Sequence, residues 1–203
     1  MSWFKERFLR VLPGVLLAAA SPAAQAQNIL VNPDFASDLS GWTLQLNGGS
    51  ITWTPLDANG SVTSGSAEVT SVVIGFGTRL TQCLSASGEQ TYEAGAKCLM
   101  PSGQTATGTP TLIVEFFSDS FCSQFIEGQV FFADEVFDTW VPFNTMPLQS
   151  PPGTGSVRYE LDLFNAATLP LTVHFDNAFL ELGRIFADSF ESGDTSAWSS
   201  VVR

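Results

Sequence analysis

Alternating charged residues in the segment Val157–Phe164 are the residues of this chain best placed to bind a ligand. Arg158, Glu160 and Asp162 stand two apart, and apolar residues occupy the positions between them. In an extended strand such residues share one face, with roughly 7 Å between successive members. We expect the apolar face to pack in a core and the charged row to hydrogen-bond the hydroxyl groups of a glycan. A charged face that contacts only water is the alternative.

Other segments carry charged and aromatic side chains that we expect beside this row. Sugar binding needs an aromatic ring against the apolar face of a pyranose, flanked by polar groups that match its hydroxyls. Trp53 is the candidate platform for stacking, although packing in the core is the alternative for this residue. The predicted ligand-binding set is Trp53, Glu93, Lys97, Glu115, Arg158, Glu160 and Asp162.

Hydrolysis is the less favoured reading of these carboxylates. A glycosidase holds two carboxyl groups about 5–5.5 Å apart for retention or about 6.5–9.5 Å apart for inversion. Glu115 and Glu160 lie on different predicted strands, but no acid/base signature surrounds them. The sequence has a single histidine, His174, and no nucleophile motif such as Gly-x-Ser-x-Gly that could form a catalytic triad with it. We therefore expect a binding protein without catalytic residues.

The balance of charge excludes nucleic acid as a partner. The 203 residues include 8 Lys and Arg against 20 Asp and Glu, a formal net charge of −12 at pH 7. A phosphate backbone is bound by cations and repelled by carboxylates. One histidine and three cysteines also exclude zinc fingers and multi-histidine metal sites.

Hydrophobic alternation with a period of two recurs along the chain and predicts an all-β fold. Turn-forming segments such as Asn47-Gly48-Gly49 separate the alternating segments. The predicted strands are Ile29–Val31, Thr43–Leu46, Ile51–Pro55, Ala67–Ile74, Arg79–Leu84, Tyr92–Met100, Thr111–Phe117, Gln129–Phe132, Val141–Thr145, Ser156–Phe164 and Leu171–Leu182. So many short strands fit a two-sheet antiparallel β-sandwich, for which the jelly roll is a standard topology.

The three cysteines allow at most one internal disulfide. If Tyr92–Met100 pairs with Thr111–Phe117 as a hairpin, Cys122 falls near Cys83, and we predict a disulfide between these two. Cys98 follows the apolar alternation of its segment, which is typical of a buried free thiol.

The sequence divides into three segments. Residues 1–26 are predicted to be a signal peptide, with a basic start, an apolar run and the small-x-small site Ala24-Gln25-Ala26. The apolar run is too short for the ~20 residues that span a bilayer, and no later stretch is long enough. We expect export from a bacterium, to the periplasm or beyond. Residues 27–182 form the predicted sandwich, and residues 183–203 form a short tail containing Asp188-Ser189-Phe190-Glu191-Ser192-Gly193-Asp194.

Five motifs, in this order, resemble the secreted jelly-roll carbohydrate-binding modules, a superfamily that includes families 4, 9, 16 and 22. The motifs are Asn28–Phe35 with Gly41-Trp42, Leu80-Thr81-Gln82 before Gly88-x-x-x-Tyr92, Val114–Asp119 before Cys122, Trp140–Phe143 and Val173–Leu180. The resemblance covers residues 28–182. It implies a non-catalytic sandwich that binds poly- or oligosaccharide on one sheet face or at its loop tips.

The resemblance also implies a structural calcium ion. Asp34 and Asp176 match acidic positions of the superfamily and are the candidate ligands, although Ala36 stands where an acidic residue is usual. Turn capping is the alternative role for both aspartates.

A second function is an exported structural or adhesive protein that binds a protein partner. The phenylalanines between Phe121 and Phe132 outnumber those that one strand face needs, so some of them are candidates for an exposed patch.

Overall fold

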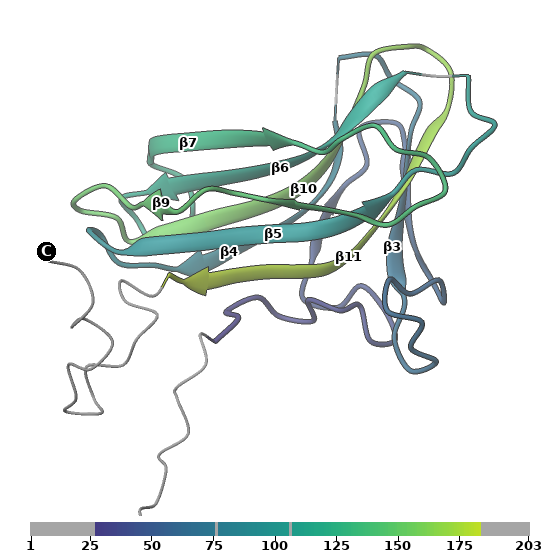
Figure 1. Ribbon diagram of the computed structural model, residues 1–203. Coiled ribbons are helices and arrows are strands. Elements are labelled where there is room, and N and C mark those ends of the chain that lie inside the picture. Colours follow the sequence, from purple (N-terminus) through teal and green to yellow (C-terminus); the bar gives the residue numbers. More distant parts are fainter. Residues whose placement is uncertain (1–26, 76, 106, 184–203) are drawn as a thin grey trace, which may run out of the picture.

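Two antiparallel sheets pack face to face in the computed structural model, which describes residues 27–183 except Phe76 and Ala106 (Figure 1). The five-stranded sheet has the order β1 (Thr43–Gln45), β4 (Thr78–Ser85), β10 (Ser156–Asn165), β6 (Gly108–Phe117), β7 (Phe125–Phe132). The six-stranded sheet has the order β2 (Ser50–Thr54), β3 (Ser66–Ser71), β11 (Leu171–Leu182), β5 (Thr91–Leu99), β8 (Val141–Asn144), and β9 (Leu148–Gln149) also pairs with β5. The predicted all-β sandwich is confirmed.

The predicted signal peptide and the tail after Gly183 lie outside the described residues. Within the described part of the chain there is no helix long and apolar enough to span a membrane.

The chain passes back and forth between the two sheets, as in a jelly roll, although β2 and β3, β6 and β7, and β8 and β9 are consecutive strands that share a sheet. β10 is the centre of the five-stranded sheet and β11 the centre of the six-stranded sheet. Apolar residues alternate along β10, and along β11 as far as Phe175, where a register shift between Asp176 and Phe179 interrupts the alternation. Tyr159 of β10 and Phe175 of β11 have no exposed surface.

The core lies between the two sheets and is filled by the inward side chains of both. The hydroxyl of Tyr159 crosses this layer and donates a hydrogen bond of 2.7 Å to the carbonyl of Gly95. Burial raises the pKa of Tyr159 well above its usual value, so the phenol stays neutral and acts as a donor. Trp42 and Phe35 stack with their ring centroids 5.3 Å apart and extend the core at one end.

Two predicted strands differ most from the structure. Ile29–Val31 is not a strand, because this part of the chain pairs only through the isolated bridge of Asn28 with Glu181. β7 begins at Phe125, four residues before the predicted start, and nearly all its side chains are exposed. An edge strand exposed on both faces has no one-sided apolar alternation that would reveal its length.

Candidate functional site

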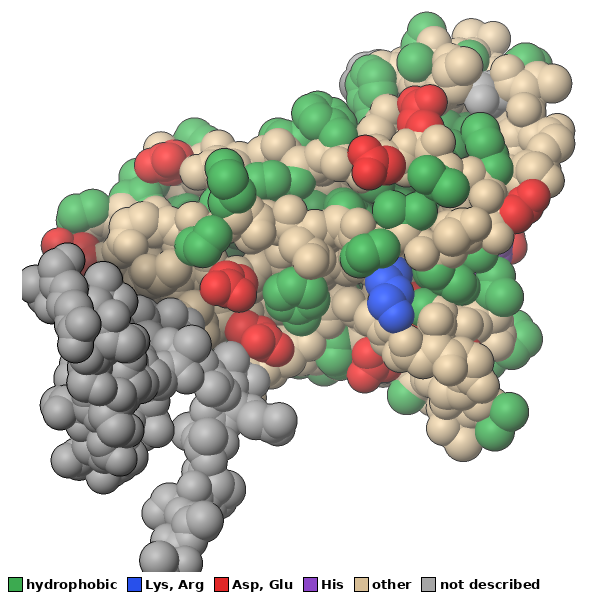
Figure 2. All heavy atoms as spheres, in the orientation of Figure 1, with side chains coloured by type: hydrophobic (Ala, Val, Ile, Leu, Met, Phe, Trp, Pro, Cys, Tyr) green, Lys and Arg blue, Asp and Glu red, His purple; other side chains and the backbone are tan. Residues whose placement is uncertain are grey.

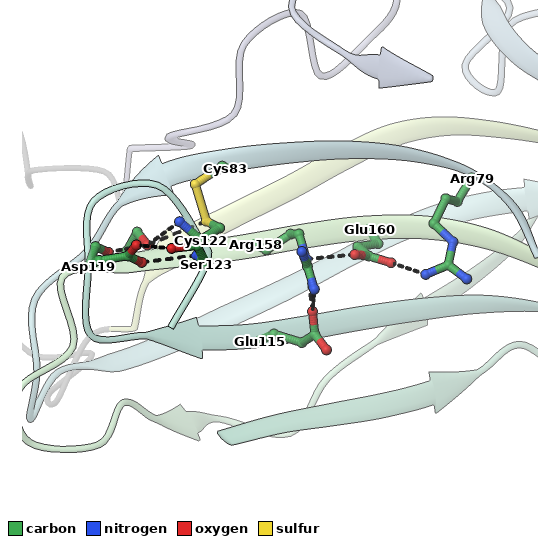
Figure 3. A network of polar contacts seen from close by, with 9 residues as sticks. Arg79, Cys83, Glu115, Asp119, Cys122, Ser123, Arg158 and Glu160 are labelled. Carbon is green, nitrogen blue, oxygen red and sulfur yellow. Dashed lines mark hydrogen bonds and ion pairs between the residues drawn. A yellow bond between two sulfur atoms is a disulfide. The ribbon is translucent and has the colours of Figure 1, made fainter. Parts of the chain in front are cut away.

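The outward face of the five-stranded sheet carries a row of charged side chains. On β10, Arg158, Glu160 and Asp162 point away from the core, as the alternation predicts. Arg158 lies opposite Glu115 of β6, and Asp162 lies opposite Arg79 of β4. We call Glu115, Arg158, Glu160, Arg79 and Asp162 the charged row (Figure 3).

Ion pairs join the members of the charged row. Glu160 binds both arginines: its Oε2 accepts a hydrogen bond from Arg79 Nη1 at 2.8 Å, and its Oε1 is 2.7 Å from Arg158 Nε. Arg158 also donates to Glu115 Oε2, at 2.8 Å from Nε. Only 3% of the Glu160 side chain is exposed, and a buried carboxylate needs such partners to offset its lost hydration.

Asp162 is the least satisfied member of the charged row. Its Oδ1 lies 3.6 Å from Arg79 Nε and has no hydrogen-bond partner. Burial raises the pKa of this carboxyl to about 6, while the nearby Arg79 lowers the pKa and Glu160 raises it further. Gly77 covers the carboxylate so closely that a Cβ there would be 1.8 Å from Oδ1. Only a glycine permits this approach.

Exposed apolar side chains border the charged row along β7. Phe125, Val130 and Phe132 stand on this edge strand with large exposed fractions, and we call these three residues the apolar border. Phe125 makes an edge contact with the buried ring of Phe117, which in turn lies 4.8 Å from the Arg158 guanidinium. Aromatic rings therefore lie directly beside hydrogen-bonding groups on this face.

Glycine leaves a gap in the apolar border. Gly128 of β7 lies opposite Glu115, and a Cβ there would approach the Glu115 Cγ to 2.8 Å and the Phe125 ring to 3.2 Å. The stem of Glu115 and the ring of Phe125 therefore both lie next to a position without a side chain, and Glu115 in turn pairs with Arg158.

The predicted disulfide between Cys83 and Cys122 is confirmed, but the proposed hairpin is wrong. β5 and β6 belong to different sheets and do not pair. The two cysteines meet because β4 and β6 both flank β10, so the β6–β7 loop reaches back to β4. Cys98 is the buried free thiol that was expected.

Three of the predicted ligand-binding residues are not beside the charged row. Glu93 and Lys97 lie on β5 and Trp53 lies on β2, all in the six-stranded sheet. The expectation that they adjoin Arg158 is wrong, because alternation assigns a face to a strand but does not assign the strand to a sheet. Trp53 Nε1 donates to the carbonyl of Phe35 at 2.7 Å, and 36% of the side chain stays exposed.

Arg79 is the member of the charged row that the sequence analysis missed. It alternates with Leu80 along β4 as Arg158 alternates with Tyr159 along β10. This alternation was the available signal, and it marks Arg79 as an outward residue. The partner strand was unknown without the topology.

The two candidate calcium ligands lie at the same place in the fold, away from the charged row. Asn177 joins them, because its side-chain amide donates to Asp34 Oδ1 at 3.1 Å and its backbone N–H donates to Asp176 Oδ1 at 2.7 Å. Asp176 is fully buried. Burial raises the pKa of Asp176 to about 6; hydrogen bonds from the backbone of Ala58 and Asn177 lower the pKa, and the neighbouring Asp57 and Asp34 raise it. No group of three or more His, Cys, Asp or Glu side chains suited to a metal ion occurs among the described residues.

Comparison with known proteins links the fold to carbohydrate-binding modules. No family profile and no curated protein sequence matches this chain. Among solved structures, Family 16 Carbohydrate Binding Module-2 is similar with a TM-score of 0.56 and 17% identity, over 75% of this chain and 99% of that chain. The CBM22-1 xylan-binding domain from Paenibacillus barcinonensis Xyn10C has a TM-score of 0.54 and 15% identity, over 81% of this chain and all of that domain.

A similar sandwich also occurs inside a larger protein. The enzymatically active domain of bacteriophage CBA120 tailspike protein 4 has a TM-score of 0.59 and 16% identity, over 77% of this chain. This chain spans about a fifth of that domain's length, at 21%. The similar structures that it covers almost completely are carbohydrate-binding modules, and their jelly-roll sandwich is the fold class of this protein.

Proposed function

We propose that this protein is a non-catalytic carbohydrate-binding protein that holds a poly- or oligosaccharide on the outward face of its five-stranded sheet. The observation that carries the proposal is the contact between the apolar border and the charged row. Phe125 is 59% exposed and lies beside the ion pair of Glu115 with Arg158. A pyranose has an apolar ring face and polar hydroxyls, and it needs this combination of a ring and hydrogen-bonding groups.

The accessible hydrogen-bonding groups of the face are held in place before a ligand binds. Arg79, Arg158 and Glu115 keep 27%, 31% and 21% of their side chains exposed, and each is fixed by its ion pairs. Fixed groups lose little conformational entropy on binding, which favours affinity.

Charge favours a neutral glycan over an acidic one. The described residues contain sixteen Asp and Glu against three Lys and Arg. The two arginines of the face already bind carboxylates of the protein. On the side of the molecule seen in Figure 2, acidic side chains are scattered widely and basic ones are scarce. A uronic acid polymer would therefore be repelled without gaining an ion pair.

The environment of Glu115 and Glu160 supports the absence of catalysis. Both carboxylates bind the same Arg158 Nε, and Glu160 is almost completely buried. A general acid must carry a proton and a general base must reach water or substrate. Both carboxylates are occupied by Arg158, and burial withholds Glu160 from a substrate.

Action outside the cytoplasm is part of the same proposal. A disulfide between Cys83 and Cys122 suits an oxidising compartment such as the periplasm or the medium. The signal-like sequence of residues 1–26 supports export.

A protein partner is the second candidate function, and one observation favours it. Phe121 and Phe132 are 82% and 68% exposed, and exposed rings close to an edge strand suit a protein interface. Pull-down with the purified protein separates the two functions: neutral polysaccharides are expected to retain it. A protein that no polysaccharide retains, and that a protein ligand captures through Phe121 and Phe132, would support the second function.

We also propose a structural calcium ion at Asp34 and Asp176. Carboxylate oxygens are the ligands that calcium prefers, and the buried Asp176 lies near two further carboxylates, Asp34 and Asp57. A cation there would offset this repulsion. The remaining ligands would be backbone carbonyls and water, because the side chains of the site do not form a complete set.

A further inference from the structure

The loop between β6 and β7, residues 118–124, crosses the outward face of the five-stranded sheet. Cys83 lies opposite Arg158 in the β4–β10 register and shares its outward orientation. The disulfide from Cys122 to Cys83 therefore carries this loop over the beginning of β10. Figure 3 shows the disulfide and the loop next to Arg158, with Glu160 and Arg79 following along the face.

Hydrogen bonds fix the loop in this position. Ser156, the first residue of β10, donates from Oγ to the Asp119 carbonyl at 2.6 Å and accepts from the Cys122 N–H at 3.2 Å. The Asp119 carboxylate accepts from the backbone N–H groups of Ser123 and Gln124 at 3.0 and 3.3 Å. Cys122 has a φ of 53°, which a non-glycine residue adopts only where the surroundings impose it.

This fixed loop presents apolar rings to solvent. Phe121 lies within it and is 82% exposed, and Phe125 begins β7 immediately after it and is 59% exposed. A phenylalanine that stays exposed in the folded state forgoes the stabilisation that burial of its ring would provide. Rings that are exposed on a rigid support suit ligand contact, because the backbone that carries them is already ordered before binding.

We infer that the loop 118–124 forms one side of the sugar-binding site on this face, and that its contact with the sugar depends on the Cys83–Cys122 disulfide. In this inference, which rests on the proposed function, Phe121 and Phe125 stack on a neutral sugar residue whose hydroxyls bind the Glu115–Arg158 pair. The occupant is a glycan because Phe125, at the end of the loop, combines an exposed ring with the neighbouring hydrogen-bonding groups of the charged row. Reduction of the Cys83–Cys122 bond by an added dithiol, which is itself oxidised to its disulfide while both cysteines become thiols, releases the loop from β4 and lowers the affinity for the glycan.

Affinity electrophoresis with neutral soluble polysaccharides, including xylan, β-glucan and galactan, tests this inference. The Phe121→Ala and Phe125→Ala variants are expected to bind about three- to tenfold more weakly, the range for loss of one ring contact. The double variant Cys83→Ser/Cys122→Ser, and the wild-type protein under reducing conditions, are expected to weaken similarly while the far-ultraviolet circular dichroism stays unchanged. Phe137→Ala is the matched control, since Phe137 is exposed but bridges to Met100, beyond β5 of the other sheet.

The outcomes separate the inference from the proposed function. A wild-type protein that binds none of these polysaccharides contradicts the proposed function itself. A wild-type protein that binds, together with an unchanged affinity of Phe121→Ala, overturns the role of the loop. That exposed substitution leaves the core intact, so the test holds even if the cysteine variant fails to fold.

Discussion

Arg79 and Glu160 form an ion pair across two neighbouring strands, with Arg79 Nη1 2.8 Å from Glu160 Oε2. Arg158 binds the other oxygen of the same carboxylate, so one buried glutamate holds both arginines of the outward face. The shape of the charged row therefore depends on Glu160 more than on any other of its members.

Substitution of Glu160 by Gln is expected to lower the free energy of unfolding. The glutamine side chain has nearly the shape of glutamate but lacks the charge that neutralises Arg79 and Arg158, whose side chains are each about one-third exposed or less. We expect a loss of about 1–3 kcal/mol, reduced from the full value for a buried pair by solvent screening. Urea denaturation measures it. Glu127→Gln is the control, with a change within about 0.5 kcal/mol, because Glu127 is exposed and has no ion pair among the described residues. Equal stability of the two variants would refute the role of Glu160.

The stability of the protein is expected to fall as the pH rises through about 6. Burial raises the folded-state pKa of Asp162 and Asp176 to about 6, whereas an unfolded aspartate has a pKa of about 3.9. The folded state therefore binds more protons between these values. The stabilisation is complete below about pH 4 and is lost as the carboxyls ionise. Denaturation at a series of pH values measures this slope, and Asp162→Asn is expected to flatten it. An unchanged slope in that variant contradicts the assignment.

Asp119 is expected to have the opposite effect and to make the stability fall as the pH drops below about 4. Hydrogen bonds from Ser123 lower the pKa of Asp119, which is half-buried in the β6–β7 loop. A lowered folded-state pKa gives stabilisation that is present above about pH 4 and is lost as the pH falls further. Asp119→Asn is expected to remove part of the acid-induced loss of stability. A loss of stability below pH 4 identical to that of the wild-type protein would contradict this role of Asp119.

Reduction of the disulfide is expected to destabilise the protein by roughly 2–4 kcal/mol, since it releases a closed segment with a sequence separation of 39.

Alkylation followed by mass spectrometry checks which cysteines are free thiols. Burial raises the pKa of Cys98 to about 12, so the native protein is expected to take up no label. After unfolding one cysteine is expected to react, and after reduction all three. Labelling of the native protein would contradict the burial of Cys98.

Calcium is expected to raise the melting temperature through Asp34 and Asp176. An ion at a hundredfold excess over its dissociation constant adds about 2.7 kcal/mol, or roughly 5–10 °C for a chain of this size. Asp176→Asn is expected to abolish the shift, and Asp162→Asn, on the charged row, is expected to retain it. A melting temperature that neither calcium nor a chelator changes would exclude the ion.

The sequence predicts the face of each strand better than it predicts the neighbours of that strand. The alternation around Arg158 correctly assigned Glu160 and Asp162 to one side of β10, because one buried face forces a period of two. It could not show that these carboxylates are themselves buried by arginines and by Gly77. That burial arises from β4 and from a loop distant in the sequence.

The separation of Lys97 from the charged row has the same cause. Lys97 has an outward position on β5, as expected, but its Nζ donates to Asn59 Oδ1 in the loop between β2 and β3, which belong to the same six-stranded sheet as β5. Pairing between strands far apart in the chain is a property of the topology, and no local pattern reports it. The disulfide prediction succeeded because β4 and β6 are both neighbours of β10.

Titration of the protein with neutral oligosaccharides in a calorimeter measures glycan binding itself. We expect heat of binding for at least one neutral oligosaccharide and none for an acidic one. We also expect weaker binding by Phe125→Ala and unchanged binding by Glu93→Gln, because Glu93 lies on the opposite sheet. Absence of binding to every neutral oligosaccharide, or binding that Glu93→Gln abolishes and Phe125→Ala leaves intact, would contradict the proposed function.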